Sequence, residues 1–316
     1  MKSSDRTETA SKERAAAMAE QRQEGLLAAT WRQFIHHPGA VAGSLILLIV
    51  VLASVLCFLS PYDPERSDLP SKLQPPSLQH PMGTDPLGRD VFTRVLYGGR
   101  ISLLVAVVVV AIGLVIGVPI GAVAGYCGGW VDNLLMRITD AALALPSLLV
   151  LILLSTILFE TELPLFKRDS PMTIALVIGL LSWMTLARLV RASFLAIREW
   201  DFVVAANAIG ASHLRIIVRH ILPNALSTVI VQVTLQLGSA IMQESGLSFL
   251  GLGIQPPTPS WGNLLGGAQP HLTRHPWLAI FPGLMIFLVR ISSNYIGDGL
   301  RDALDPHKVL TGIGEV

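Results

Sequence analysis

Charged side chains are scarce in this sequence. Of its 316 residues, 14% are Asp, Glu, Lys or Arg, whereas 52% are hydrophobic. A soluble domain usually has charged side chains at about a quarter of its positions, because these residues cover its water-facing surface. The formal net charge is only +1, so the composition does not indicate a nucleic-acid partner either. The composition predicts an integral membrane protein.

Cysteine is nearly absent, and the common catalytic motifs are missing altogether. Cys57 and Cys127 lie near opposite ends of successive apolar runs, so we expect them to fill apolar space rather than to form a disulfide. The sequence contains no G-x-x-x-x-G-K-[ST], H-E-x-x-H, C-x-x-C or G-x-S-x-G. We therefore expect a chain that is not an enzyme, binds no metal and has no Walker A loop for ATP.

Long apolar runs, by contrast, are abundant. Five of them contain no Asp, Glu, Lys, Arg or His and approach the roughly 20 residues that cross about 30 Å of hydrocarbon. A sixth run, Pro276–Val289, is short and must continue past Arg290 to Ile296, with the arginine snorkelling or facing protein. The sequence thus predicts an all-α integral membrane protein with six transmembrane helices. The first five are Ala40–Leu59, Ile101–Ala124, Ala141–Phe159, Pro171–Ala187 and Ala225–Gln243.

The distribution of positive charge orients these helices. With the amino terminus inside, 15 of the 23 Lys and Arg residues lie on the cytoplasmic side and 8 lie outside, as the positive-inside rule requires. Both termini are then cytoplasmic. The predicted parts are a tail with an interfacial helix (1–39), a first transmembrane helix (40–60), an external loop with an amphipathic helix (61–100), a core (101–297) and a cytoplasmic C-terminal tail (298–316).

Two segments are predicted to lie outside. In the first, Asp85 is expected to cap an amphipathic helix that begins at Pro86. The second, residues 245–275, is rich in Gly and Pro and contains Phe249 and Trp261. It either contacts an external partner or plugs the helix bundle, and both interpretations remain open.

Glycines recur every four residues in the second apolar run. Gly113, Gly117, Gly121 and Gly125 would share one helical face. Small residues at this spacing let another helix approach closely. We expect this face to pack against a neighbouring helix rather than to contact a solute.

Polar side chains follow one face of the fifth apolar run. Thr228, Gln232, Gln236, Ser239 and Gln243 recur at spacings of three or four residues. At membrane depth such groups must face protein or water. The stripe either lines a wet, uncharged pathway for a solute or forms hydrogen bonds between helices, and both interpretations remain open.

The absence of charge and histidine from the five longer runs also excludes some mechanisms. An intramembrane hydrolase or a proton-coupled carrier is expected to place ionisable side chains in such spans. The predicted interior is uncharged, which indicates a pore driven from outside this chain.

One amphipathic segment, Asp201–Asn224, separates two apolar runs. Alanines in its first half favour a short helix, and Gly210 permits a tight turn after it. In the second half, Ser212 is expected to cap a helix that Pro223 ends. The expected apolar stripe of that helix consists of Leu214, Ile217, Val218 and Ile221. We therefore predict a helix-turn-helix that lies on the cytoplasmic membrane surface and docks a partner.

The stretch AANAIGASHLRIIVRHILPN within this segment resembles the cytoplasmic EAA loop of ABC importer permeases. The residues that match the loop pattern are Ala205, Ala206, Gly210, Ile221 and Pro223. HPMGTDPLGRDVFTRVLYGGRISL and LSFLGLGIQPPTPSWGNLL are similar to the C-type permease of dipeptide, oligopeptide and nickel importers. The resemblance covers about residues 31–308. Val204 occupies the position of the loop's characteristic glutamate, so the contact of that carboxylate cannot be transferred to this chain.

The resemblance implies a type I importer fold in the bacterial cytoplasmic (inner) membrane. The implied partners are a second permease, two cytoplasmic ATPase subunits and an extracytoplasmic solute-binding protein. ATP and Mg would be bound by the ATPases, and this chain would hold no cofactor. The coupling loop, residues 198–223, would contact an ATPase through Ala205, Ala206, Gly210, Ser212, Leu214, Arg215 and Pro223.

The implied function is ATP-driven import of di- or oligopeptides. The same architecture would equally suit nickel or another small solute, because a fold does not determine the cargo. In a different class of function, the chain would be a non-transporting membrane scaffold that recruits a cytoplasmic partner through residues 201–224.

Overall fold

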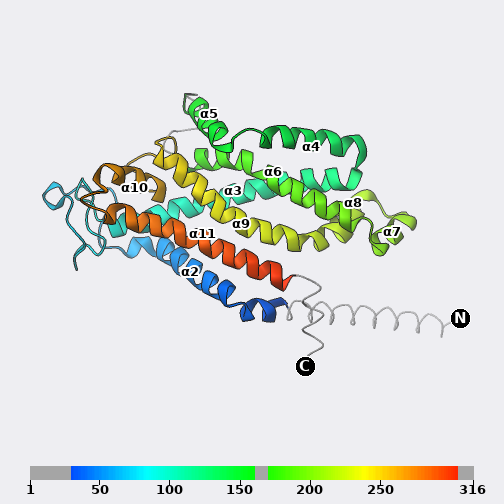
Figure 1. Cartoon of the computed structure of the whole chain (residues 1–316), viewed down its shortest axis with the longest axis horizontal. Helices are drawn as coiled ribbons and strands as arrows, with labels where there is room; N and C mark the ends of the chain where they lie inside the picture. The colour runs from blue at the N-terminus through cyan, green and yellow to red at the C-terminus, as the bar shows by residue number, and fades with distance from the viewer. Residues whose placement is uncertain (1–29, 161–169, 305–316) are drawn as a thin grey trace.

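The computed structural model of the chain describes residues 30–160 and 170–304, which form a bundle of helices (Figure 1). Within these residues no strand is present apart from an isolated bridge between Thr84 and Asp90. The prediction of an all-α protein is therefore confirmed for this part of the chain. Most of the predicted N-terminal tail and of the C-terminal tail lies outside the described residues.

Five helices in the described part are long and apolar enough to cross a membrane. They are Pro38–Leu59 (α2, Pro38–Val55, and η1, Leu56–Leu59), Val91–Cys127 (α3), Pro171–Ile197 (α6), His213–Phe249 (α8, His213–Arg215; η3, Ile216–Ile221; α9, Leu222–Phe249) and Trp277–Ala303 (α11). As predicted, α11 continues through Arg290. The Arg290 guanidinium faces protein, because its Nη1 donates to the Ser239 hydroxyl at 2.8 Å.

The predicted third span is bent rather than straight. Helices α4 (Gly129–Leu143) and α5 (Ser147–Glu160) meet at 86°. Pro146 lies at the bend, and a proline ring disfavours helical backbone at the residue before it. Helix α4 includes Asp132, Arg137 and Asp140, whereas α5 is almost entirely apolar. The predicted number of six spans therefore holds only if this bent pair counts as one span.

Helix α3 begins at Val91 rather than directly after Asp85. The Asp90 carboxylate caps it by accepting a hydrogen bond from the Thr93 N–H at 2.7 Å. The predicted cap at Asp85 is wrong because Gly88 has φ +74°, which interrupts any helix that starts there. The Asp85 side chain instead accepts hydrogen bonds from backbone N–H groups of the turn that follows it.

The glycine face of α3 lies against α6. A Cβ atom on Gly117 would lie 2.7 Å from the Trp183 carbonyl oxygen, and one on Gly125 would lie 2.7 Å from that of Arg191. Gly121 faces the backbone of α6 in the same way, at the Ala187 carbonyl. Helix α3 contributes no side chain at these positions, so its backbone lies directly against carbonyl oxygens and Cβ atoms of α6.

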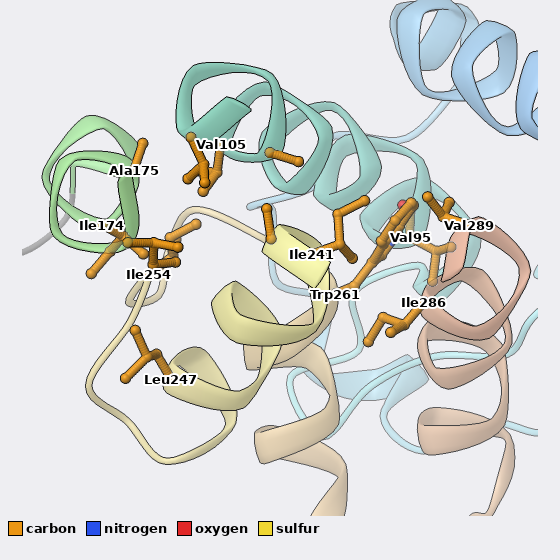
Figure 2. Close-up of a cluster of buried hydrophobic side chains, with 14 of the residues drawn as sticks. Val95, Val105, Ile174, Ala175, Ile241, Leu247, Ile254, Trp261, Ile286 and Val289 are labelled. Carbon is orange, nitrogen blue, oxygen red and sulfur yellow. The ribbon is translucent and has the colours of Figure 1, made fainter. Parts of the chain in front are cut away.

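The main apolar core lies between α3, α6, α9, α11 and the short helix α10 (Trp261–Ala268), as Figure 2 shows. Trp261 is only 1% exposed, and its indole Nε1 donates to the Val95 carbonyl at 2.9 Å. Residues 250–268, whose role the sequence left open, therefore pack onto one end of the bundle. A second cluster of buried residues joins the opposite ends of α3 and α6 to α7 (Asp201–Ala208), η3 and α9.

Replacement of Gly121 by Ala should lower the thermal stability of the purified protein. The added methyl group would overlap the Ala187 carbonyl, and relief of such overpacking typically costs about 1–3 kcal/mol. Gly246→Ala in α9 is the matched control, because a Cβ there has no neighbour within 4 Å. Thermal unfolding in detergent should show a lower midpoint for Gly121→Ala and an unchanged or higher midpoint for the control. Equal midpoints in both variants would contradict the close approach of α3 and α6.

Candidate coupling segment and solute pathway

The coupling segment, residues 198–223, contains a two-turn helix that ends at a glycine. After α7, Gly210 has φ +78°, and its N–H donates to the Asn207 carbonyl at 3.0 Å. The N–H of Ala211 donates to the Ala206 carbonyl at 3.1 Å. This pair of bonds is a Schellman motif, which requires a left-handed residue at the position of Gly210. A Cβ on Gly210 would have no neighbour within 4 Å, so the turn needs glycine for its backbone conformation and not for space.

The second half of the segment differs from the prediction. Ser212 occupies the N-cap position of α8, but its hydroxyl makes no capping hydrogen bond. From Ile216 to Ile221 the chain forms a π-helix, η3, and α9 follows at once. Pro223 therefore does not end the helix. A π-turn relieves the clash between a proline ring and the carbonyl four residues before it, which allows the helix to continue.

The π-turn also changes which side chains are buried. Ile216 and Ile221 are buried although they are five residues apart, whereas Leu214 is 71% exposed and Val218 is also exposed. The predicted stripe assumed 3.6 residues per turn and is therefore wrong at Leu214 and Val218, whereas Ile221 is buried as predicted. The buried side chains of the segment, Val203, Ala206, Ile216 and Ile221, pack with Phe194 and Ile197 at the end of α6.

The outer face of the coupling segment is apolar with basic residues beside it. Ile209 is 86% exposed, and Phe202, Val204, Leu214 and Val218 are also exposed. Arg215 and Arg219 are exposed among them. Of the seven predicted coupling residues, all except Ala206 are exposed. Exposed apolar residues that cluster at one end of the bundle are typical of a surface that binds another protein.

A cleft of about 650 Å³ separates the coupling segment from the end of α3. Its lining includes Tyr126, Arg198, Val203 and His213. The Tyr126 hydroxyl and the His213 Nδ1 are hydrogen-bonded at 2.7 Å, so the end of α3 is tied to the start of α8. The cleft offers a partner both apolar walls and polar groups.

Ion pairs connect α6 to α4 near the coupling segment. The Arg191 guanidinium binds the Asp132 carboxylate through two nitrogens, with Nη2 2.6 Å from Oδ2. Arg188 pairs with Asp140 one turn earlier on α6. Arginines that served as orientation signals in the sequence therefore also join two helices, and the bidentate geometry makes the Arg191 pair directional.

The polar stripe of α9 divides into two parts. Thr228 and Gln232 line a groove of about 510 Å³ together with Leu189 of α6 and Arg301 of α11. This part of the stripe faces an open groove.

The other part of the stripe contacts neighbouring helices. Gln236 is buried, its Nε2 donates to the Ser182 carbonyl at 3.4 Å, and a Cβ on Gly113 would lie only 2.6 Å from that nitrogen. The Ser239 hydroxyl accepts the hydrogen bond from Arg290. Both positions therefore serve contact between helices in this conformation.

The expectation of an uncharged interior is wrong at Glu244. Helix α9 continues to Phe249, and Glu244 within it is 0% exposed. The apolar run ends at Gln243 only because the next residue is charged, although serines continue the helical pattern as far as Ser248. Extending the run by two turns would have revealed this buried carboxyl.

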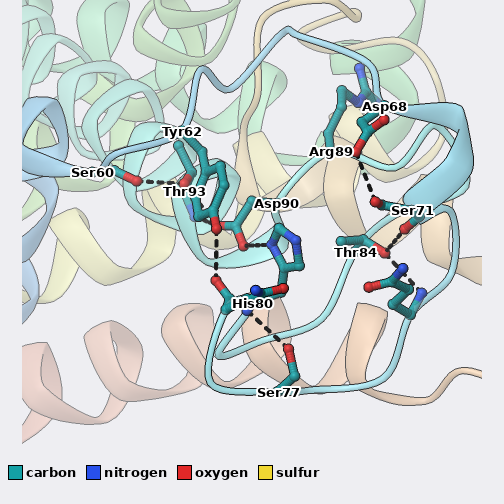
Figure 3. Close-up of polar contacts among 12 residues, drawn as sticks. Ser60, Tyr62, Asp68, Ser71, Ser77, His80, Thr84, Arg89, Asp90 and Thr93 are labelled. Carbon is teal, nitrogen blue, oxygen red and sulfur yellow. Dashed lines mark hydrogen bonds and ion pairs between the residues drawn. The ribbon is translucent and has the colours of Figure 1, made fainter.

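The segment between η1 and α3 is held by a polar network, shown in Figure 3. The His80 Nδ1 lies 2.9 Å from an Asp90 carboxylate oxygen, and the Ser60 and Thr93 hydroxyls are 2.6 Å apart. Arg94 is only 2% exposed and donates to the Pro64 carbonyl at 2.7 Å. The predicted external loop is therefore an ordered layer attached to the start of α3.

The described residues contain no group of three His, Cys, Asp or Glu side chains that could hold a metal ion. Both cysteines are free; Cys57 is buried, but Cys127 is exposed, so the prediction that both fill apolar space is wrong for Cys127.

Comparison with known proteins agrees with these features. Residues 117–309, more than half of the chain, match the family described as binding-protein-dependent transport system inner membrane component. Residues 25–76 match the N-terminal transmembrane domain of oligopeptide transport permease C.

Two relatives resemble most of the chain. A putative peptide permease protein of Brucella suis biovar 1 is 41% identical over 290 residues, which are 90% of this chain and 93% of the relative. The glutathione transport system permease protein GsiD of Escherichia coli O6:K15:H31 is 41% identical over 278 residues, 87% of this chain and 89% of the relative. With its long apolar helices, the chain is a multi-pass protein of the inner membrane. It belongs to the family of inner membrane permeases of binding-protein-dependent ABC transporters.

Proposed function

We propose that this permease forms, with a second permease, the pathway by which an ATP-driven importer moves di- or oligopeptides across the membrane. One structural observation carries the mechanism. The chain from His213 to Phe249 is a single continuous helix that starts in the coupling segment and contains the polar groove residues Thr228 and Gln232. When the outer face of the coupling segment moves, the helix that lines the proposed pathway therefore moves with it.

The parts of the coupling segment pack together, which favours movement of the segment as one unit. The Gly210 turn holds α7 against η3, and buried Ala206, Ile216 and Ile221 join both to the end of α6. When ATP closes the two ATPase subunits, the docked segments would move with them and switch the spans from inward-facing to outward-facing. The free energy for this switch comes from the difference in ATP affinity between the two states.

The proposed partners follow from the family. Two ATPase subunits would bind ATP and Mg, so this chain would be non-catalytic and hold no cofactor itself. A binding protein would deliver the solute on the side of residues 60–90 and α10, and both termini would lie in the cytoplasm. Val204 adds apolar contact surface where the loop's usual carboxylate is absent, so we expect docking by shape and apolar burial, supplemented by Arg215 and Arg219.

The proposed cargo rests on the relatives and on the groove. Both relatives described above are named as permeases for peptides or for glutathione, which is itself a tripeptide. Thr228 and Gln232 offer neutral hydrogen-bonding groups that suit the amide groups of short peptides. Nickel or another small solute is the alternative cargo, and a scaffold that transports nothing is the alternative function.

Reconstitution of the whole complex should distinguish transport from a scaffold role. Loaded binding protein should stimulate ATP hydrolysis by the complex in proteoliposomes, because the permease couples the two events. Mass spectrometry of the complex in mild detergent should detect all subunits and a retained peptide. An ATPase rate that does not respond to loaded binding protein would favour a scaffold, and retained metal without peptide would favour the other cargo.

Gly210→Val should release the ATPase from the permease. A β-branched residue in the left-handed region costs about 1–2 kcal/mol, and relief of this strain would open the Schellman turn and displace α7. Co-purification of the ATPase with tagged permease should fall, while the amount of permease in the membrane stays the same.

Gly251→Val is the matched control for this prediction. Gly251 has the same φ of +78° and no neighbour within 4 Å, but it follows α9 at the other end of the bundle. ATPase association should remain intact in this variant. Loss of the ATPase in both variants, or in neither, would contradict the assignment of the docking surface to the Gly210 turn.

Gln232→Leu should alter peptide uptake without weakening ATPase association. The change removes hydrogen-bonding groups from the groove that Thr228 and Gln232 line. Gln236→Leu is the comparison variant: Gln236 is buried, its Oε1 has no hydrogen-bond partner and its Nε2 makes only the 3.4 Å bond to the Ser182 carbonyl, so an apolar replacement loses a single long hydrogen bond and no group of the groove. Uptake kinetics in proteoliposomes should change several-fold only in Gln232→Leu, since about 1 kcal/mol separates a satisfied from a lost hydrogen bond. Unchanged kinetics in Gln232→Leu would assign the whole stripe to packing.

A further inference from the structure

Glu244 is a fully buried carboxyl that the proposed mechanism leaves unused. Its Oε2 accepts hydrogen bonds from the hydroxyls of Ser102 at 2.8 Å and Ser245 at 3.3 Å, and its Oε1 accepts one from Ser248 at 2.8 Å. Among the residues that the structure describes, no cation pairs with it. The group is thus surrounded by hydroxyls of α3 and α9 and by that of Ser260, the N-cap residue of α10.

Two of these serines also bind the segment that follows α9. The Ser102 hydroxyl accepts a hydrogen bond from the Trp261 N–H at 3.3 Å, and the Ser248 hydroxyl accepts one from the Ile254 N–H at 3.0 Å. A hydroxyl has one hydrogen to donate and two lone pairs to accept with. Because each hydrogen is directed to Glu244, the lone pairs are free for the two backbone N–H groups. Glu244 therefore acts through its serine neighbours.

The segment held in this way closes one end of the bundle. Ile254 is buried in the main apolar core, and Trp261 lies between α3, α9 and α11 (Figure 2). A Cβ on Gly262 would lie only 2.6 Å from the Ser245 Cα, so α10 rests directly on α9. This is the end that the proposed function places outside.

We propose that Glu244 is the positioning residue of an external closure. It orients Ser102 and Ser248, and their hydroxyls hold residues 250–268 over the ends of α3 and α9. This closure is released when the pathway opens outward. An apolar side chain of similar size would fill the same volume without the cost of burying a carboxyl. Hydrogen bonds to hydroxyls, unlike apolar packing alone, fix one orientation of the segment and can be exchanged for others when it moves. The inference rests on the proposed function for the side of the membrane and for the need to open.

The closure can be measured by the reactivity of a buried cysteine. In a background with Cys57→Ala and Cys127→Ala, Ala268→Cys places a thiol on the buried face of α10, where Ala268 is 2% exposed. A membrane-impermeant maleimide added outside to the complete complex should label this thiol slowly. Labelling should accelerate when ATP and loaded binding protein are supplied together, and a rate that does not change would overturn release during the cycle.

Variants of the carboxyl and its donors then test the positioning role. Glu244→Ala should raise the labelling rate without nucleotide by about tenfold or more, since hydrogen bonds to a buried carboxyl are lost. Ser102→Ala and Ser248→Ala should give smaller increases, and Glu244→Gln, which keeps one acceptor oxygen, should lie between Ala and the parent. Uptake should fall in the same order while ATPase association is retained.

Ser293→Ala is the control, because Ser293 is also a buried serine but its hydroxyl has no hydrogen-bond partner. It should leave labelling and uptake unchanged. Unaltered labelling in Glu244→Gln and in both serine variants would overturn the proposal even if Glu244→Ala failed to fold, as would an equal increase in Ser293→Ala. Labelling that follows the predicted order in a complex without peptide uptake would instead retain the closure and reject the proposed cargo.

Discussion

The direct backbone contact between α3 and α6 is the constraint on which the rest of the described structure depends. Gly117, Gly121 and Gly125 add no side chain from α3 between the two helices, so the distance between the helices and their register are set together. Their shared end presents Tyr126 and Phe194 as the base on which the coupling segment packs. Any side chain on the glycine face would shift that base, and the coupling segment would shift with it.

Helix α9 is held on this base by different chemistry at each end. Near the coupling segment, apolar packing of Ile216 and Ile221 and the Gly210 turn determine its position. At the other end, the serine hydroxyls around Glu244 hold it to α3 and to the segment before α10. Apolar packing tolerates small sliding motions, whereas hydrogen bonds to a buried carboxyl are directional. The end of the helix near the coupling segment can therefore slide slightly, whereas the end at Glu244 keeps one orientation until its hydrogen bonds break.

The sequence predicted those features that depend on composition and simple period. The apolar runs became helices, Gly210 forms a left-handed turn, and α11 continues through Arg290, which faces protein, one of the two placements expected. The wrong predictions of helix ends share a cause: the backbone preference of one residue was overridden by that of a neighbour. Gly88 prevents the helix expected at Asp85, and the π-turn before Pro223 allows a helix that proline alone would end. Pro146 bends a span that hydropathy presents as straight, since hydropathy does not record backbone angles.

Glu244 escaped prediction because a charge was taken as the end of an apolar run, although neighbouring serines supply its hydrogen bonds in the fold.

One consequence of the helix that runs from His213 to Phe249 is mechanical. Gln236, just beyond its midpoint, is wedged at Gly113 between α3 and α6. A tilt of this helix about that contact would move its two ends in opposite directions.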